Sequence, residues 1–146
     1  MNNPFILDAC ALIALLANEP GAENVIKIIQ DAIDGDIIVK INQINLLEVY
    51  YDVCKIYGED AANNALETIR KLPIEIIVGL SDEVFRKAGQ IKSKYKIPLG
   101  DAIAMAECKI NNGILVTSDH KDFEPMEKLE NLKINWFRDV LKTPVT

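Results

Sequence analysis

Short apolar runs alternate with amphipathic segments along almost the whole chain, and this alternation restricts the fold more than any other feature. The runs predict strands at Phe5–Leu7, Ile37–Ile41, Ile74–Val78, Ile114–Thr117 and Leu132–Phe137. Each run is short and apolar throughout, as in strands that are covered on both faces. Strands of this kind, separated by helices, predict an α/β fold in which a central, mostly parallel sheet is flanked by helices in three layers.

The segments between the strands carry residues that mark helix ends. Asn42 and Ser81 are favoured helix N-caps, and Gly58 and Pro73 are favoured helix stops. Together with the spacing of apolar side chains, these signals predict helices at residues 9–17, 22–33, 43–57, 61–72, 82–94 and 101–110. No repeat or linker interrupts the pattern.

Length, charge and cysteine content narrow the class of protein. A chain of 146 residues fits one domain with its own core, so we expect a single domain over residues 1–146. The net charge of −6 argues against a general electrostatic nucleic-acid binder, but not against an enzyme that acts on nucleic acid. Three widely spaced cysteines indicate a reducing cytoplasm. Neither a signal peptide nor a membrane span is expected, since no apolar run reaches about 18 residues.

Three acidic residues occupy positions where the pattern otherwise places apolar side chains. Asp8 interrupts the run Phe5–Ile13, and Asp101 opens the apolar stretch Ala102–Ala106. Glu48 lies in the middle of a predicted helix. None of the three has a Lys or Arg partner nearby in the sequence, and an unpaired carboxylate in an apolar interior usually takes up a cation or a proton.

Asp119 follows the predicted strand Ile114–Thr117, much as Asp8 follows the first strand. Ligand sites in parallel sheets lie beyond the carboxyl ends of the strands, so these carboxylates should share one edge. Thr117 and Ser118 can donate hydrogen bonds there, to a phosphate or a carboxylate. Several carboxylates without basic partners predict a divalent metal site, and hard oxygen ligands suit Mg²⁺ or Mn²⁺.

Each of these carboxylates also has a structural interpretation. Asp8, Asp101 and Asp119 can act as helix N-caps, for which Asp is a favoured residue. Glu48 cannot cap from the middle of a helix, but it can lie at the edge of an exposed face. A site shared by all four residues explains the set better than four separate coincidences.

Three further features leave alternatives open. Asp122 can serve as an outer ligand or as a solvated turn residue. His120, the only histidine, can in principle pair with Cys10, although Cys10 is interpreted as a core residue. The segment Arg86–Lys96 carries five basic residues and no acidic one, which predicts either a solvated helix face or a basic rim that binds phosphates.

Four motifs, in this order, resemble those of PIN-domain ribonucleases, most closely the toxins of VapBC-type toxin–antitoxin pairs. They are Ile6–Leu16, Asn45–Val49, Leu99–Ala106 and Leu115–Phe123. The family usually has Ser or Thr two residues after the first aspartate, where this chain has Cys10.

The resemblance implies a PIN-like fold in which Asp8, Glu48, Asp101 and Asp119 gather in one catalytic pocket that binds Mg²⁺ or Mn²⁺. Asp8 and Asp101 are then expected as direct metal ligands, Glu48 as a ligand or the base for the attacking water, and Asp119 as a residue that orients water. It also implies an RNA endonuclease that is a homodimer and is held inactive by a cognate antitoxin. Two other hypotheses stay open: an RNA-processing nuclease without an antitoxin, and a PIN-like module that binds RNA or protein without catalysis.

Overall fold

A five-stranded sheet runs through the centre of the computed structural model, which describes residues 3–139. The strands are β1 (Phe5–Leu7), β2 (Val39–Asn42), β3 (Glu75–Ile77), β4 (Ile114–Thr117) and β5 (Ile134–Trp136). Their order across the sheet is β3-β2-β1-β4-β5, and all four neighbouring pairs are parallel. The prediction of an α/β fold around a mostly parallel sheet is therefore confirmed.

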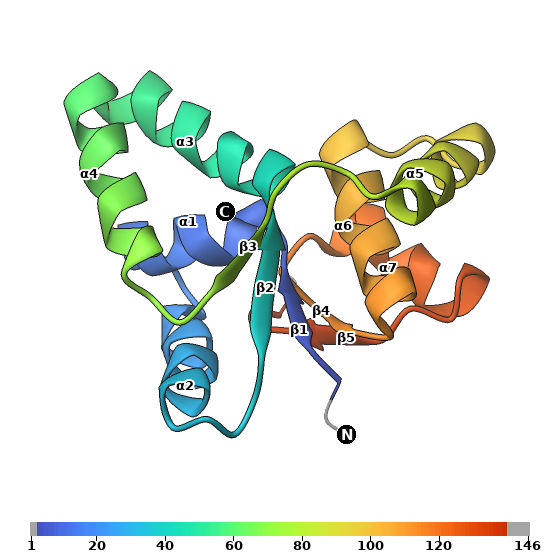
Figure 1. Ribbon diagram of the computed structural model, residues 1–146, viewed down its shortest axis with the longest axis horizontal. Helices are drawn as coiled ribbons and strands as arrows, with labels where there is room; N and C mark the ends of the chain where they lie inside the picture. The colour runs from blue at the N-terminus through green and yellow to red at the C-terminus, as the bar shows by residue number, and fades with distance from the viewer. Residues whose placement is uncertain (1–2, 140–146) are drawn as a thin grey trace, which may run out of the picture.

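Seven helices within residues 3–139 cover the two faces of the sheet. They are α1 (Ala9–Ala17), α2 (Ala22–Ile33), α3 (Gln43–Tyr57), α4 (Glu59–Arg70), α5 (Asp82–Lys94), α6 (Leu99–Asn111) and α7 (His120–Leu129). Figure 1 shows α1 to α4 on one side of the sheet and α5 to α7 on the other, which gives the three layers that the sequence predicts. Within the described residues, no helix is long and apolar enough to cross a membrane.

The alternation of side chains along the strands divides the core in two. Leu7 and Val116 pack in the cluster that includes α1 to α4, whereas Ile6 and Leu115 pack in the cluster that includes α5 to α7. Successive strand residues point to opposite faces, so each central strand serves both clusters. This is why the central strands are apolar throughout.

Two predictions about helix starts are corrected by the structure. Asp101 does not cap α6, because the helix already begins at Leu99 and Pro98 is its N-cap residue. No helix range was predicted between the last two strands, although Asp119 was a candidate N-cap there; α7 lies in this interval, and Asp119 caps it by accepting from the Asp122 amide at 3.1 Å. Pro125 lies within α7, and because proline lacks a backbone N–H it argues against a helix in the sequence. The helix nevertheless has a buried face, formed by Phe123 and Met126.

The strand order reverses at β1, and this reversal places a crevice beyond the carboxyl ends of β1 and β4. The chain proceeds from β1 to β2 and β3 in one direction, and then returns to β4 and β5 on the other side of β1. The connections that leave β1 and β4 therefore diverge, and ligand sites of open α/β sheets lie at such a point, outside the carboxyl ends of the strands.

Candidate active site

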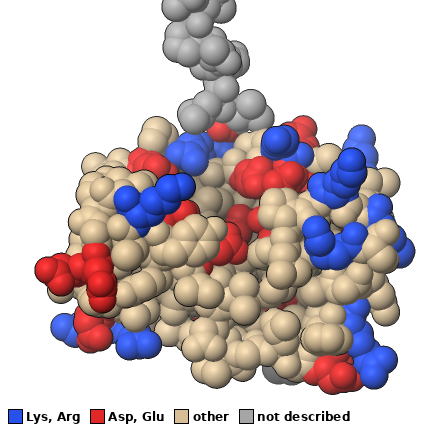
Figure 2. Space-filling view, turned by 90° about the horizontal axis from the view of Figure 1, so that it is seen from above, with Lys and Arg blue, Asp and Glu red and all other residues tan. Residues whose placement is uncertain are grey.

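The candidate site lies where β1, β2 and β4 end. Asp8 follows β1, Asn42 ends β2, and Thr117 ends β4 two residues before Asp119. Figure 2 looks down on this edge of the molecule and shows carboxylate side chains gathered in a hollow near its centre. Lys and Arg side chains border the same face, mainly on the side of α5.

Asp8 is buried and its carboxylate has two groups of partners. Oδ1 accepts a hydrogen bond from the Ala9 amide at 2.9 Å, so Asp8 does cap α1. Oδ2 accepts from the Thr117 hydroxyl at 3.0 Å and from the Cys10 thiol at 3.4 Å. Burial raises the pKa of Asp8 above its ordinary value, against the lowering effect of these hydrogen bonds. Capping and a place in the site are thus compatible for this residue.

Cys10 was interpreted as a core residue, and the structure places it only partly in the core. Its side chain packs against the cluster of α1 to α4, but its sulfur also faces Asp8 and lies 3.3 Å from the Thr117 hydroxyl oxygen. Burial, and then the neighbouring Asp8, raise the pKa of Cys10 to about 12. The thiol therefore stays protonated and donates to Asp8, as a hydroxyl at this position would.

Asp101, Asp119 and Asp122 form the tightest part of the site. One carboxylate oxygen from each lies within 4.8 Å of those from the other two. Burial is the main cause that raises the pKa of Asp101 and of Asp119, and the charge of Asp8 raises the pKa of Asp101 further. The Oδ2 atom of Asp101 is buried and has no hydrogen-bond partner within residues 3–139.

This donor set fits a divalent cation. Three carboxylates are close enough to share one ion, and an unpartnered buried oxygen is costly unless something binds it. Oxygen ligands of this kind suit hard cations such as Mg²⁺, Mn²⁺ or Ca²⁺. Asp122, left open between an outer ligand and a turn residue, belongs to this group.

Glu48 approaches the same site from α3, at mid-helix as predicted. Burial, and then the charges of Asp8 and Asp52, raise its pKa to about 7. Asn45 donates to its Oε1 atom at 3.4 Å, and no Lys, Arg or His of residues 3–139 pairs with it. Glu48 lies outside the three-aspartate group, but the charge of Asp8 raises the pKa of both Glu48 and Asp101, and the charge of Asp119 raises that of Asp8. The structure therefore places the four predicted carboxylates close enough to repel one another.

Sequence reasoning missed several residues that shape the site. Asn45 is fully buried and donates to the Gly100 carbonyl at 3.0 Å, which joins α3 to the start of α6. Gly100 leaves room for Glu48, since a Cβ built on it would lie only 1.7 Å from the Glu48 Oε1 atom. Glu107, also buried, interrupts an apolar stretch of α6, which is the same signal that drew attention to the other carboxylates.

The alternative Cys10–His120 pair does not form in the structure. The His120 ring stacks on Trp136 with centroids 4.0 Å apart. Its nitrogens contact the Arg138 carbonyl at 2.8 Å and the Glu124 carboxylate at 3.3 Å. His120 therefore joins α7 to the segment after β5 and takes no part in the acidic site.

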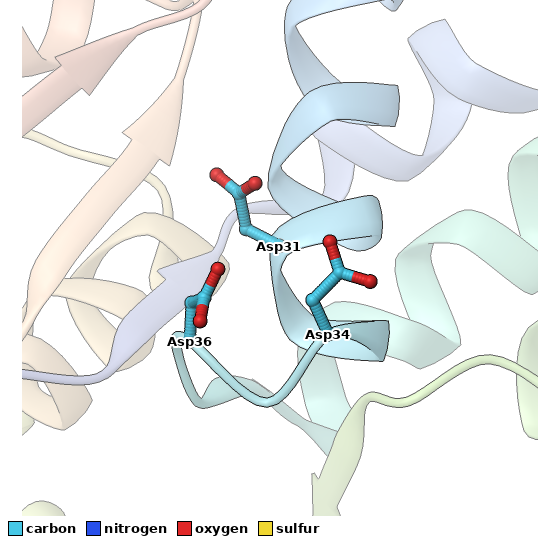
Figure 3. A group of neighbouring side chains, drawn as sticks. All are labelled: Asp31, Asp34 and Asp36. Carbon is cyan, nitrogen blue, oxygen red and sulfur yellow. The ribbon is translucent and has the colours of Figure 1, made fainter.

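A second group of aspartates lies elsewhere on the surface. Asp31, Asp34 and Asp36 meet at the end of α2 and the loop that follows it (Figure 3). Asp34 and Asp36 are exposed, and Lys27 forms an ion pair with Asp31. An exposed acidic group of this kind needs no ligand, and it supplies a comparison for variants of the buried site.

The raised pKa values predict how the metal-free protein responds to pH. Glu48 and Asp101 hold protons in the folded state at a pH where the unfolded chain has lost them, so the stability that they contribute at low pH is lost as the pH rises. For Glu48 this loss should run from about pH 4.5 to about pH 7. Urea unfolding in EDTA should therefore give a lower free energy of unfolding at pH 7.5 than at pH 5. A free energy that rises over this interval would contradict the argument.

The sequence and the fold are similar to those of known proteins. The family model for the PIN domain matches residues 5–129. VapBC2 from Rickettsia felis, solved with a promoter DNA fragment, superimposes with a TM-score of 0.72 at 19% identity, covering 90% of this chain and 96% of the other. DNA-bound VapBC from Salmonella typhimurium gives 0.70 at 14% identity, covering 93% and 99%.

A third solved structure, the sarcin–ricin loop cleaving toxin VapC20 from Mycobacterium tuberculosis, gives a TM-score of 0.66 at 12% identity. It covers 83% of this chain and 94% of its own. No curated protein matches the sequence. At such low identities these structures establish a shared fold, and the family model spans most of the chain. The protein therefore belongs to the PIN domain family.

Proposed function

We propose that this protein is a metal-dependent endoribonuclease, and that residues 1–146 act as one nuclease domain. The observation that carries the proposal is the set of buried and half-buried carboxylates without basic partners, in which one oxygen of Asp101 is left unpartnered. PIN domain toxins are nucleases, and one protein of the same fold is a toxin that cleaves the sarcin–ricin loop. Mg²⁺ or Mn²⁺ is the proposed cofactor.

Each carboxylate has a proposed part in hydrolysis of the phosphodiester bond. Asp8 and Asp101 bind the cation directly, Asp119 orients water, and Asp122 completes the group that surrounds the ion. A bound divalent cation supplies Lewis-acid activation of water and neutralises charge on the phosphate. Glu48 is a ligand or the base: a pKa near 7 suits a group that takes a proton from the attacking water at neutral pH. Its Oε1 atom is held by Asn45, which leaves Oε2 for that proton.

The substrate is proposed to be RNA with an exposed, single-stranded loop. Lys and Arg side chains border the face of the site (Figure 2), and the basic segment Arg86–Lys96, most of which belongs to α5, is proposed to supply lysines that bind phosphates on either side of the scissile bond. Part of this segment has other partners, since Arg86 pairs with Asp82 and Lys92 donates to the Ile97 carbonyl. The remaining lysines are the proposed phosphate contacts.

The experiment that tests the proposal is cleavage of a structured RNA pool by the purified protein. Cleavage should require Mg²⁺ or Mn²⁺ and stop in EDTA. An Asp8→Ala preparation, purified in the same way, should be inactive, which excludes a contaminating ribonuclease because a contaminant would cleave in both. If the folded parent cleaves no RNA with either metal, the proposal fails in favour of a PIN-like binding module.

We further propose that the protein is the toxin of a toxin–antitoxin pair, acts in the cytoplasm and forms a homodimer. The Klebsiella pneumoniae, Rickettsia felis and Salmonella typhimurium structures that share its fold are toxin–antitoxin complexes. An apolar groove of about 280 Å³ between α1, α3 and α4 offers the antitoxin a binding surface. It is lined in part by Leu16, Val53, Ile56 and Tyr57, of which Ile56 is 70% exposed. The cognate gene should lie beside this one, and its absence would favour an RNA-processing nuclease.

Ile56→Asp is expected to weaken antitoxin binding without loss of cleavage. Burial of such a side chain contributes about 1.5–3 kcal/mol, so the Kd should rise about 10- to 100-fold. The measurement is titration calorimetry with the neighbouring gene's product, beside an RNA cleavage assay. Ile33→Asp is the control, because Ile33 is 65% exposed on α2 and does not line the groove. Equal loss of affinity in both variants would place the antitoxin elsewhere.

A further inference from the structure

Glu107 is a buried carboxylate for which the proposed reaction has no role. It lies on α6, six residues beyond Asp101, and is only 2% exposed. No Lys, Arg or His of residues 3–139 forms an ion pair with it. A buried acidic group without a cation is destabilising unless hydrogen bonds compensate for its lost hydration. The contacts of Glu107 therefore need an explanation.

Two side-chain amides supply those hydrogen bonds. Asn42 donates from Nδ2 to Glu107 Oε2 at 2.6 Å, and Asn111 donates from Nδ2 to Oε1 at 3.2 Å. The orientation of Asn42 is fixed, because its Oδ1 atom caps α3 by accepting from the Ile44 amide at 2.8 Å. Its NH₂ group must then face Glu107 and the Gly79 carbonyl, which it also contacts at 3.1 Å. Only an acceptor can occupy the facing position on α6.

These contacts belong to a polar seam between α3 and α6. Asn42, Asn45 and Glu48 follow one another at intervals of three residues along the α3 side of the seam. Asn42 contacts Glu107, near the end of α6, whereas Asn45 and Glu48 contact Gly100, near its start. The two helices therefore pack antiparallel along the seam. The Asn42–Glu107 pair thus closes the seam at one end, and Glu48 meets the turn that carries Asp101 at the other, roughly 9 Å along the helix.

We propose that Glu107 is a positioning residue for the nuclease reaction: through Asn42 it sets the spacing of α3 and α6, and hence the spacing of Glu48 and Asp101. The inference rests on the proposed function, since it assigns a role within that same site. Glu107 does not touch the substrate or the cation. It acts by holding α3, which carries Glu48, against α6, which carries Asp101. Residues 58–98 separate the two helices in the chain, so contacts between them must fix their spacing.

Glu107→Met tests this proposal with little change of volume. Met offers neither amide a strong acceptor, so the hydrogen bond from Asn42 is lost, whereas a Gln oxygen would still accept from Asn42. We expect kcat per folded molecule to fall about 10- to 100-fold with KM for RNA unchanged, since small displacements of catalytic groups have effects of this size. Mn²⁺ affinity, measured by calorimetry in the absence of RNA, should fall as well. Asn42→Ser, which keeps a side-chain oxygen to cap α3 but removes the NH₂ group, should show both effects.

Two further variants separate positioning from general stability. Asn111→Ala removes the other amide, which lies on α6 itself and does not reach α3, and it should lower the melting temperature while kcat and Mn²⁺ affinity stay at the parental level. The exchanged pair Glu107→Gln/Asn42→Asp restores a donor opposite an acceptor and keeps the helix cap, but it loses the hydrogen bond to the Gly79 carbonyl, so activity should recover in part. If Glu107→Met does not fold, Asn42→Ser and the exchanged pair decide the question.

The outcomes are distinct. Parental kcat and Mn²⁺ affinity in folded Glu107→Met or Asn42→Ser, or equal losses in Asn111→Ala, would overturn the positioning role. A parent that neither cleaves RNA nor binds Mn²⁺ would instead overturn the proposed function. If the parent binds Mn²⁺ but no RNA in the assay is cleaved, the Mn²⁺ affinities of the variants decide the question.

Discussion

Asp101→Asn is expected to reduce RNA cleavage by at least about 100-fold while the metal-free protein becomes more stable. The Asp101 carboxylate is the one whose Oδ2 atom is buried without a partner, and an amide at that position binds a cation poorly. Loss of residues that only support metal ligands typically reduces affinity or activity 10- to 100-fold, so loss of a direct ligand should have at least that effect. An amide is neutral in both the folded and the unfolded chain, so the variant avoids the cost of burying or protonating this carboxylate, and its melting temperature in EDTA should rise.

The opposite signs of these two effects make the test specific. Added Mn²⁺ should raise the melting temperature of the parent by mass action, and should do so much less in Asp101→Asn. Asp34→Asn is the matched control, because it removes a carboxylate from the exposed aspartate group of Figure 3 and should leave cleavage and the Mn²⁺ response unchanged. A variant that loses cleavage because it is unfolded would show a lower melting temperature in EDTA, which would contradict the site assignment.

The central strands and two of the site carboxylates could be predicted because each depends on residues that are neighbours in the sequence. Buried parallel strands read as uninterrupted apolar runs, so β1 and β4 were predicted with the bounds that the structure has. Asp8 and Glu48 were found because each breaks such a pattern. The strand ends and helix starts then place both residues at one edge of the sheet, as the topology of parallel strands requires.

Contacts between distant segments could not be predicted in the same way. The sequence identifies Glu48 and Gly100, but only the packing of α3 on α6 shows that one lies against the other. Glu107 carries the same local signal as Glu48, yet its partner Asn42 is 65 positions away. Such pairs depend on how far one helix is shifted along its neighbour. A hydrophobic pattern shows which face of a helix is buried, but it fixes this shift only to within about one helical turn.

The contact between Gly100 and Glu48 makes activity sensitive to the residue at position 100. Gly100→Ala is expected to reduce cleavage by about 100-fold in a protein that folds normally, because a Cβ at this position meets the Glu48 carboxylate itself: Oε1 at 1.7 Å and Cδ at 2.7 Å. The three heavy atoms nearest to that Cβ all belong to the end of the Glu48 side chain, so Glu48 can rotate away without disturbing the backbone. Displacement of a catalytic group by about 1 Å is enough for a loss of this size.

Stability should stay close to the parental level while activity falls. Ala is favoured over Gly within a helix by about 0.5–1 kcal/mol, which offsets the cost of moving Glu48. Gly89→Ala, in the middle of α5 with open space around its Cβ, should gain the same helix stability and keep full activity. In a Glu48→Ala background, Gly100→Ala should cause no further loss, because the displaced carboxylate is already absent. An additive loss in that double variant would mean that Gly100 acts on the site through something other than Glu48.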